Sequence, residues 1–141
     1  MKWFFDTSVL IAAFLEDHEN HEPSFAVFTA ANRRVACCAG HSLAEVYATV
    51  TRLPGKYRMS GQQVLLILEE IEERLAIVSL ESEEYLAVIR RAAGSGIVGG
   101  TVYDALLAGC AMKANAETIY TWDERHFRLF GSEIATRVRK P

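Results

Sequence analysis

The stretch WFFDTSVLIAAF, residues 3–14, places a single carboxylate between an apolar strand and an apolar helix. Residues 3–5 are all aromatic, which favours a short β-strand. Beyond Asp6, apolar side chains recur at intervals of three and four residues, which predicts an amphipathic helix over 7–17. Asp6 can cap that helix, because an aspartate side chain accepts hydrogen bonds from the first backbone N–H groups. A chemical role for Asp6 depends on where the other acids lie.

The rest of the chain continues the alternation of strands and helices. Strands are predicted at 34–39, 75–80, 117–121 and 133–138, the second of them of the buried type. Helices are predicted at 21–33, 42–53, 61–75, 82–93 and 101–115, with a turn and a short helix over 122–130. Ser60 and Gln63 form a capping-box pattern before the 61–75 helix. Such alternation implies right-handed βαβ crossovers, so we predict one α/β domain, residues 1–141, with a central parallel sheet between helices.

Composition is that of an ordinary globular domain, with 50% hydrophobic and 23% charged residues. A formal net charge of −3 argues against a protein that holds nucleic acid mainly through a large cationic surface. The apolar N-terminal run is broken by Asp6 and is too short to span a bilayer, so we expect a cytoplasmic protein with no membrane contact. The three cysteines, Cys37, Cys38 and Cys110, favour buried free thiols over a disulfide framework.

Four acidic residues lie close to the carboxyl ends of predicted strands or to the starts of helices. Asp6 and Asp123 follow strands, whereas Glu45 lies near the start of the helix after the 34–39 strand. Asp104 lies near the start of the helix that follows the glycine-rich 94–100 segment. Ligands of an open parallel sheet bind outside the carboxyl ends of its strands. All four carboxylates can therefore converge at one edge of the sheet.

Each acid also has a purely structural interpretation. Glu45 and Asp104 end patterns that approximate capping boxes, and the other two acids can be helix N-caps. Clustered carboxylates repel one another, and a divalent cation removes that cost. An all-oxygen ligand set selects Mg²⁺ or Mn²⁺, which can activate a water for phosphodiester hydrolysis. Ser8 and Thr121 each lie two residues from an acid and can orient a carboxylate or a water, or can cap locally.

Four segments resemble, in order and spacing, the motifs of PIN-domain ribonucleases, and most closely those of VapC-type toxins of toxin-antitoxin pairs. They are FFDTSVLIAAF (4–14), HSLAEVYATVTRLP (41–54), GGTVYDALLAGCA (99–111) and IYTWDERHF (119–127). The resemblance runs from residue 3 to about residue 130, and LPGKYRMSGQQ (53–63) need not match the family closely.

This resemblance implies a PIN-like three-layer α/β/α domain. It also implies that Asp6, Glu45, Asp104 and Asp123 hold Mg²⁺ or Mn²⁺ and hydrolyse RNA. Thr121 matches the threonine of the family's T-x-D pattern, and Ser8 matches the small polar residue after the first acid. The family further implies a homodimer and a cognate antitoxin whose tail covers the active site.

Other features are weaker signals. The basic residues Arg52, Lys56 and Arg125 can contact RNA phosphates beside the metal, although solvated surface charge explains them equally simply. The G-x-G-x-x-G pattern at 94–99 follows a helix rather than a strand, so it does not predict a dinucleotide site. His41 and His126 lie near the acids, but hydrolysis by a metal-activated water requires no dedicated base.

The function predicted from the sequence is therefore a Mg²⁺- or Mn²⁺-dependent endoribonuclease, the toxin of a type II toxin-antitoxin pair. Two alternatives remain at this stage. One is a PIN nuclease that processes RNA without an antitoxin. The other is a non-catalytic α/β binding module in which the acids act only as caps.

Overall fold

The computed structural model describes residues 1–141 and contains five strands, eight α-helices and one short 3₁₀ helix. The strands are β1 (Trp3–Phe5), β2 (Ala36–Ala39), β3 (Ala76–Val78), β4 (Thr118–Tyr120) and β5 (Val138–Arg139). The helices before β3 are α1 (Thr7–Phe14), α2 (His21–Thr29), α3 (Gly40–Val50), η1 (Gly55–Tyr57) and α4 (Gly61–Arg74). Those after β3 are α5 (Ser82–Gly94), α6 (Thr101–Lys113), α7 (Glu124–Arg128) and α8 (Ser132–Ala135).

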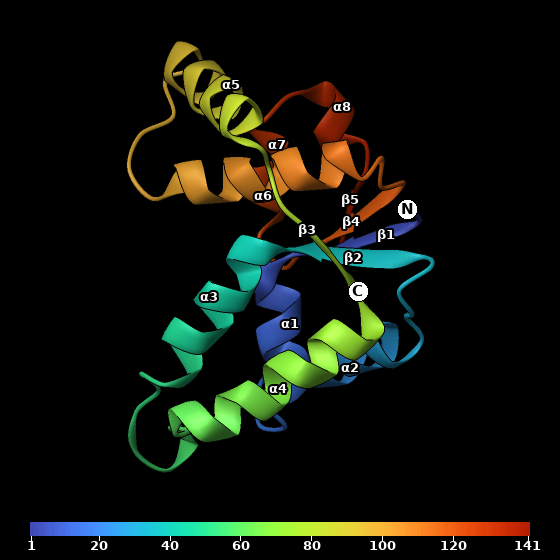
Figure 1. Cartoon of the computed structure of the whole chain (residues 1–141), viewed down its shortest axis with the longest axis vertical. Helices are drawn as coiled ribbons and strands as arrows, with labels where there is room; N and C mark the ends of the chain where they lie inside the picture. Colours follow the sequence, from blue (N-terminus) through green and yellow to red (C-terminus); the bar gives the residue numbers. More distant parts are fainter.

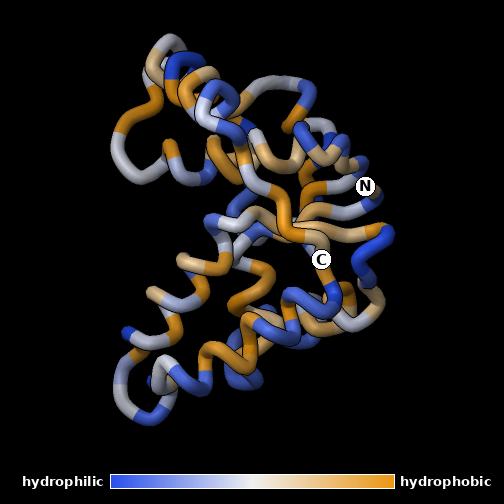
Figure 2. The backbone as a smooth tube through the Cα atoms, viewed as in Figure 1, coloured by the Kyte–Doolittle hydropathy of each residue, from blue (hydrophilic) through white to orange (hydrophobic).

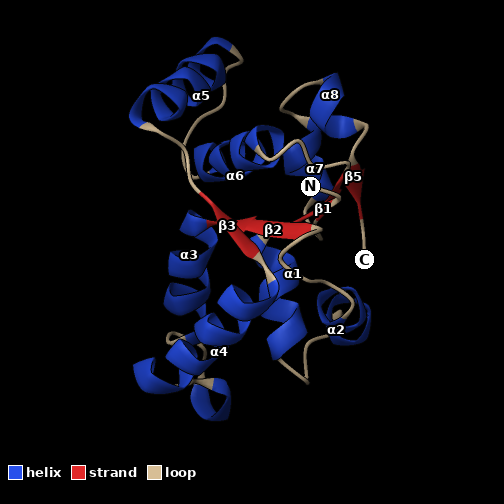
Figure 3. Cartoon of the chain, turned by 45° about the vertical axis from the view of Figure 1, so that its right-hand side comes forward, coloured by secondary structure: helices blue, strands red, loops and turns tan.

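All strand pairs are parallel, and the sheet has the order β3-β2-β1-β4-β5. The first strand is central, since Phe4 is in register with Cys37 of β2 on one side and with Ile119 of β4 on the other. Helices α1 to α4 cover one face of the sheet and α5 to α8 cover the other (Figure 1, Figure 3). This confirms the predicted three-layer α/β/α fold.

Successive side chains of each central strand enter opposite layers of the core. Phe5 and Cys38 pack in the layer beneath α1 to α4, whereas Phe4 and Cys37 pack in the layer beneath α6 to α8. This two-residue period is what a strand buried on both faces requires. The strands accordingly form one of the most apolar parts of the chain in Figure 2.

All three cysteines are free and buried, as predicted. Burial raises the pKa of the Cys37 thiol and of the Cys110 thiol to about 11. Burial likewise raises the pKa of Cys38. The thiols are therefore protonated near neutral pH and act as small apolar side chains.

Three local predictions can be compared with the structure. The capping box at α4 is confirmed, since Ser60 Oγ accepts from Gln63 N (3.2 Å) and Gln63 Oε1 accepts from Ser60 N (2.8 Å). The predicted strand at 75–80 exists as β3, but it is an edge strand and only half-buried. None of the helices is long and apolar enough to cross a bilayer.

The predicted strand at 133–138 is wrong. Residues 132–135 form α8, and only Val138 and Arg139 pair with β4. Helical backbone bonds close this segment, with Ala135 N donating to Gly131 O at 2.9 Å. Ile134 is the one buried residue of α8, and the helical turn directs it into the layer beneath α6. Tertiary packing of a single apolar side chain thus overrides the β-branched composition.

Candidate active site

Asp6 lies at the carboxyl end of β1 and is almost completely buried, with 4% of its surface exposed. As the N-cap of α1, it accepts a long bond from Ser8 N (3.4 Å). The same carboxylate oxygen, Oδ2, accepts from Ser8 Oγ (2.6 Å) and from Thr121 Oγ1 (2.8 Å). Capping is thus only one part of the environment of Asp6.

Ser8 and Thr121 connect Asp6 to the loop that carries Asp123. Thr121 Oγ1 accepts from Asp123 N at 2.9 Å, and Ser8 Oγ accepts from Trp122 N at 3.0 Å. Each hydroxyl therefore donates to Asp6 while accepting from the β4–α7 segment. The orientation of Asp6 is thus coupled to the segment that carries Asp123, through Thr121, which lies 115 residues after Asp6.

Asp104 of α6 and Asp123 before α7 meet at His126. The His126 Nδ1 atom lies 3.0 Å from Asp104 Oδ2 and 2.7 Å from Asp123 Oδ2. One ligand atom from each of the three residues lies within 4.8 Å of the other two, a spacing that can hold a metal ion. Sequence reasoning did not assign His126 to the site, although its i, i+3 spacing from Asp123 was a usable signal.

Glu45 reaches the cluster from α3. Glu45 Oε1 lies 2.9 Å from the Thr7 hydroxyl and 3.9 Å from His41 Nε2. The Thr7 hydroxyl also lies 2.9 Å from Ser42 Oγ. Thr7 and Ser42 are buried and position Glu45. The sequence alone did not predict these roles, because Ser42 is the first residue of the capping-box pattern that ends at Glu45 and Thr7 belongs to no such pattern.

Capping does not account for the other three acids. Helix α3 begins at Gly40 with Ala39 as its N-cap, so Glu45 lies in the second turn. Helix α6 has Gly100 as its N-cap and no side-chain capping bond, and the Asp123 side chain does not cap α7. Of the four acids, only Asp6 caps a helix with its side chain.

The carboxylates interact electrostatically. Burial raises the pKa of Asp6 to about 6, against the lowering effect of its hydrogen bonds from Ser8 and Thr121, and the charge of Asp104 raises it further. Burial also raises the pKa of Asp104, and the charges of Asp123 and Glu45 raise it as well. The hydrogen bond with His126 lowers the Asp104 pKa and so offsets part of this increase. Negative charge at this edge is therefore costly in the metal-free protein, and a cation bound among the carboxylates would relieve the repulsion. The donor set fits a hard divalent metal.

The predicted RNA-contacting residues fall in two places. Arg125 is on α7, exposed and without an ion pair, next to the acids. Arg52 lies past the end of α3, seven residues and about 10 Å along the helix direction from Glu45. Lys56 lies farther along the chain in η1, at the distant end of α3 (Figure 1). Arg125 is therefore close to Asp123 only along the chain, and no hydrogen bond or ion pair joins any of the three basic residues to an acid of the cluster.

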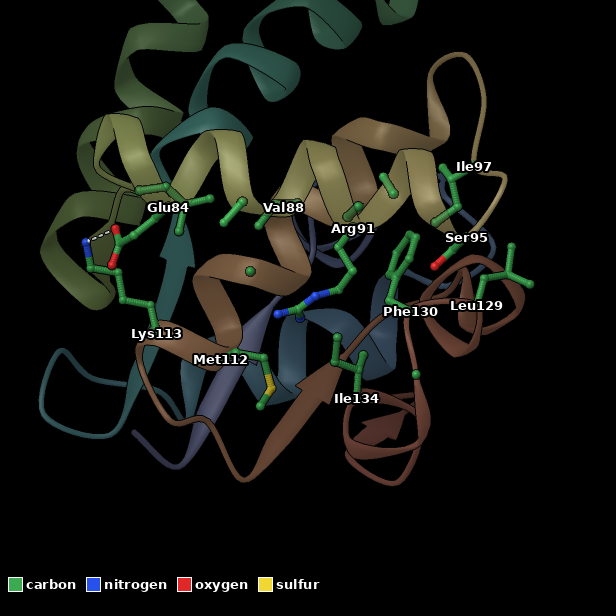
Figure 4. A pocket seen from close by; sticks show the side chains of 16 residues that line it. Glu84, Val88, Arg91, Ser95, Ile97, Met112, Lys113, Leu129, Phe130 and Ile134 are labelled. Carbon is green, nitrogen blue, oxygen red and sulfur yellow. Dashed lines mark hydrogen bonds and ion pairs between the residues drawn. The ribbon is translucent and has the colours of Figure 1, made fainter.

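A well-formed cavity lies elsewhere in the molecule. It has a volume of about 500 Å³ and lies between α5, α6 and the segment leading into α8 (Figure 4). Its walls are mainly apolar, and at one end Lys113 Nζ pairs with Glu84 Oε2 at 2.7 Å. None of the four acids lines it. The acid cluster and this cavity are therefore separate features of the molecule.

Comparisons with known proteins agree with this geometry. Residues 3–131 match the family model of the PIN domain. Ribonuclease VapC27 of Mycobacterium tuberculosis is 38% identical over 112 residues, which cover 79% of this chain and 78% of the relative.

Two solved structures share the fold. The crystal structure of M. tuberculosis VapC20, a sarcin-ricin loop cleaving toxin, superposes with a TM-score of 0.72 at 13% identity, covering 89% of this chain and 92% of the other. The crystal structure of VapBC2 from Rickettsia felis, bound to a DNA fragment from its promoter, superposes with a TM-score of 0.62 at 20% identity. The match covers 92% of this chain and 93% of the other.

Proposed function

This chain belongs to the PIN domain family, and from that premise we propose that residues 1–141 form a single endoribonuclease domain whose metal ligands are Asp6, Glu45, Asp104 and Asp123. The observation that supports the proposal is that Asp104 lies close enough to Asp6, Glu45 and Asp123, each from a separate segment, for their charges to interact. Ligand atoms of Asp104, Asp123 and His126 also lie within 4.8 Å of one another. Three of the four have no capping role, so helix stability does not explain their placement.

The bound ion in this proposal is Mg²⁺ or Mn²⁺. Carboxylate oxygens are the ligands that both ions prefer, and no thiolate is available to favour zinc because the cysteines are in the core. When bound, such an ion supplies Lewis-acid stabilisation at a phosphate and a water of lowered pKa.

The protein residues prepare this site in distinct ways. Ser8 and Thr121 fix the direction of the Asp6 carboxylate, and Thr7 fixes Glu45. The Nδ1 atom of His126 hydrogen-bonds with Asp104 and lies within ion-pair distance of Asp123, so the ring keeps these two acids side by side before a cation arrives. Partners of this kind orient metal ligands and tune their affinity.

RNA is the substrate that family membership favours, and Arg125 is the residue best placed to contact a phosphate beside the acids. Phosphate contacts by Arg52 and Lys56 stay predictions, because both lie at the distant end of α3. The family relation further supports a toxin that forms a homodimer and is held inactive by a cognate antitoxin. A PIN nuclease without an antitoxin is distinguished by gene neighbourhood, since a toxin gene lies beside a small antitoxin gene.

The test is cleavage of a mixed RNA pool by the purified protein with Mg²⁺, with Mn²⁺ and with a chelator. Asp6→Asn is compared with Asp17→Asn, which removes an exposed acid from the loop after α1. We expect metal-dependent cleavage by the wild type and by Asp17→Asn, and none by Asp6→Asn. Cleavage that persists in Asp6→Asn or in chelator would contradict the proposed metal site.

A further inference from the structure

His41 of α3 and Tyr103 of α6 form a stacked aromatic pair beside the acid cluster. Their ring centroids are 5.4 Å apart and their planes are inclined by 19°. His41 Nε2 lies 3.9 Å from Glu45 Oε1, and Tyr103 directly precedes Asp104 in the first turn of α6. The pair therefore joins the two helices that supply Glu45 and Asp104.

Packing of the protein itself does not explain Tyr103. The side chain is 50% exposed, belongs to neither core cluster, and its hydroxyl makes no hydrogen bond. His41 stacks on the phenol ring, and about half of the Tyr103 surface remains exposed to solvent. A preorganised aromatic surface thus lies at the edge of the acidic site.

We propose that the His41–Tyr103 pair is a stacking subsite for one unpaired base of the RNA substrate. The inference rests on the proposed ribonuclease function and adds a substrate feature to it, namely an unpaired nucleotide next to the cleaved phosphate. Bases that are splayed out of a loop or a single strand commonly stack on aromatic side chains of proteins. Stacking accepts any base, because every base has a π-face.

The electrostatics of the site favour this mode of binding. The protein has a net charge of −3, and of the basic residues predicted to contact RNA only Arg125 is close to one of the acids in sequence, two residues after Asp123. Phosphate contacts alone therefore give weak attraction at this edge. A stacked base adds affinity that does not depend on positive charge, and it positions the neighbouring phosphate relative to the carboxylates.

A second pair elsewhere in the protein supplies a matched control. Phe25 of α2 stacks on His21 with the same centroid separation of 5.4 Å and is 49% exposed. None of the four acids lies on α2, and His21 Nδ1 hydrogen-bonds with Ala12 O at 2.9 Å. Phe25→Leu removes an equally exposed stacked ring away from the proposed site.

The experiment measures binding of short single-stranded RNAs that carry the fluorescent base 2-aminopurine at successive positions, in chelator so that no cleavage occurs. We expect stacking to quench the fluorescence at one position in the wild type. Tyr103→Leu should abolish that quench and weaken binding by about 5- to 150-fold. Tyr103→Phe, which keeps a ring, and Phe25→Leu should both behave like the wild type.

Parallel cleavage assays in Mg²⁺ separate this inference from the function on which it rests. A rise in KM for Tyr103→Leu, with correct folding by circular dichroism, supports the subsite. Unchanged binding, quench and KM in Tyr103→Leu would overturn it and would indicate a surface reserved for a protein partner. If the wild type quenches but never cleaves, the nuclease assignment fails while the base-stacking surface stands.

Discussion

Asp6→Asn is predicted to stabilise the metal-free protein while destroying its activity. The Asp6 pKa rises from an ordinary 3.8 to about 6 because the carboxylate is buried. A raised pKa in the folded state means that the native protein binds the proton more tightly than the unfolded chain does. The contribution of Asp6 to the free energy of unfolding is therefore fully present below about pH 4 and is lost as the pH rises through about 6.

The magnitude follows from the pKa. At about 1.4 kcal/mol for each tenfold change in proton affinity, burying the charged Asp6 costs about 3 kcal/mol at pH 7. Asparagine has no charge, and its amide oxygen can still accept the bonds from Ser8 and Thr121. We expect Asp6→Asn to recover most of that free energy of unfolding at neutral pH in chelator.

The assay is urea denaturation in chelator from pH 4 to pH 8, for the wild type, Asp6→Asn and the exposed control Asp17→Asn. The wild type should lose stability up to about pH 6, and Asp6→Asn should show a shallower slope, with Asp104 accounting for the remainder. Added Mg²⁺ should stabilise the wild type and leave Asp6→Asn unchanged. An unchanged pH slope, or a less stable Asp6→Asn at pH 7, would refute the reasoning.

Three further substitutions test other parts of the structure. Thr121→Val removes the hydroxyl that joins Asp6 to Asp123 N, so the metal affinity measured by calorimetry should fall about 10- to 100-fold. An unaltered metal affinity would mean that this hydroxyl does not position Asp6. Thr7→Val removes the donor to Glu45 and should lower kcat in a well-folded protein, whereas full activity would show that Glu45 orients itself. Ser60→Ala breaks the capping box of α4 and should cost about 1 kcal/mol in urea denaturation with no change in cleavage; a loss of cleavage would connect α4 to the site.

Local sequence patterns identified the parts of the site that depend on strand order. Asp6 and Asp123 follow strands, and parallel topology alone brings such positions to one edge. The supporting roles of Thr7, Ser42 and His126 were not predicted, because these roles arise where α1 faces α3 and where α7 faces α6. A single sequence does not reveal which helices face one another across a sheet.

The error at 133–138 has the same origin. Periodicity within six residues does not distinguish a short strand from a helical turn when one buried side chain, Ile134, decides the outcome. The capping box of α4 was predictable, since both of its members lie within four residues of each other.

The central place of β1 in the sheet has a consequence for synthesis on the ribosome. Strand β1 is synthesised first, but one of its two edges pairs with β4, which is synthesised fourth among the strands. The hydroxyl of Thr121 that donates to Asp6 is synthesised 115 residues after Asp6. Nascent chains that carry only α1 to α6 lack Asp123, His126 and one of the three hydrogen bonds that the Asp6 side chain accepts. The order of translation therefore delays assembly of the acid cluster until the chain is largely complete.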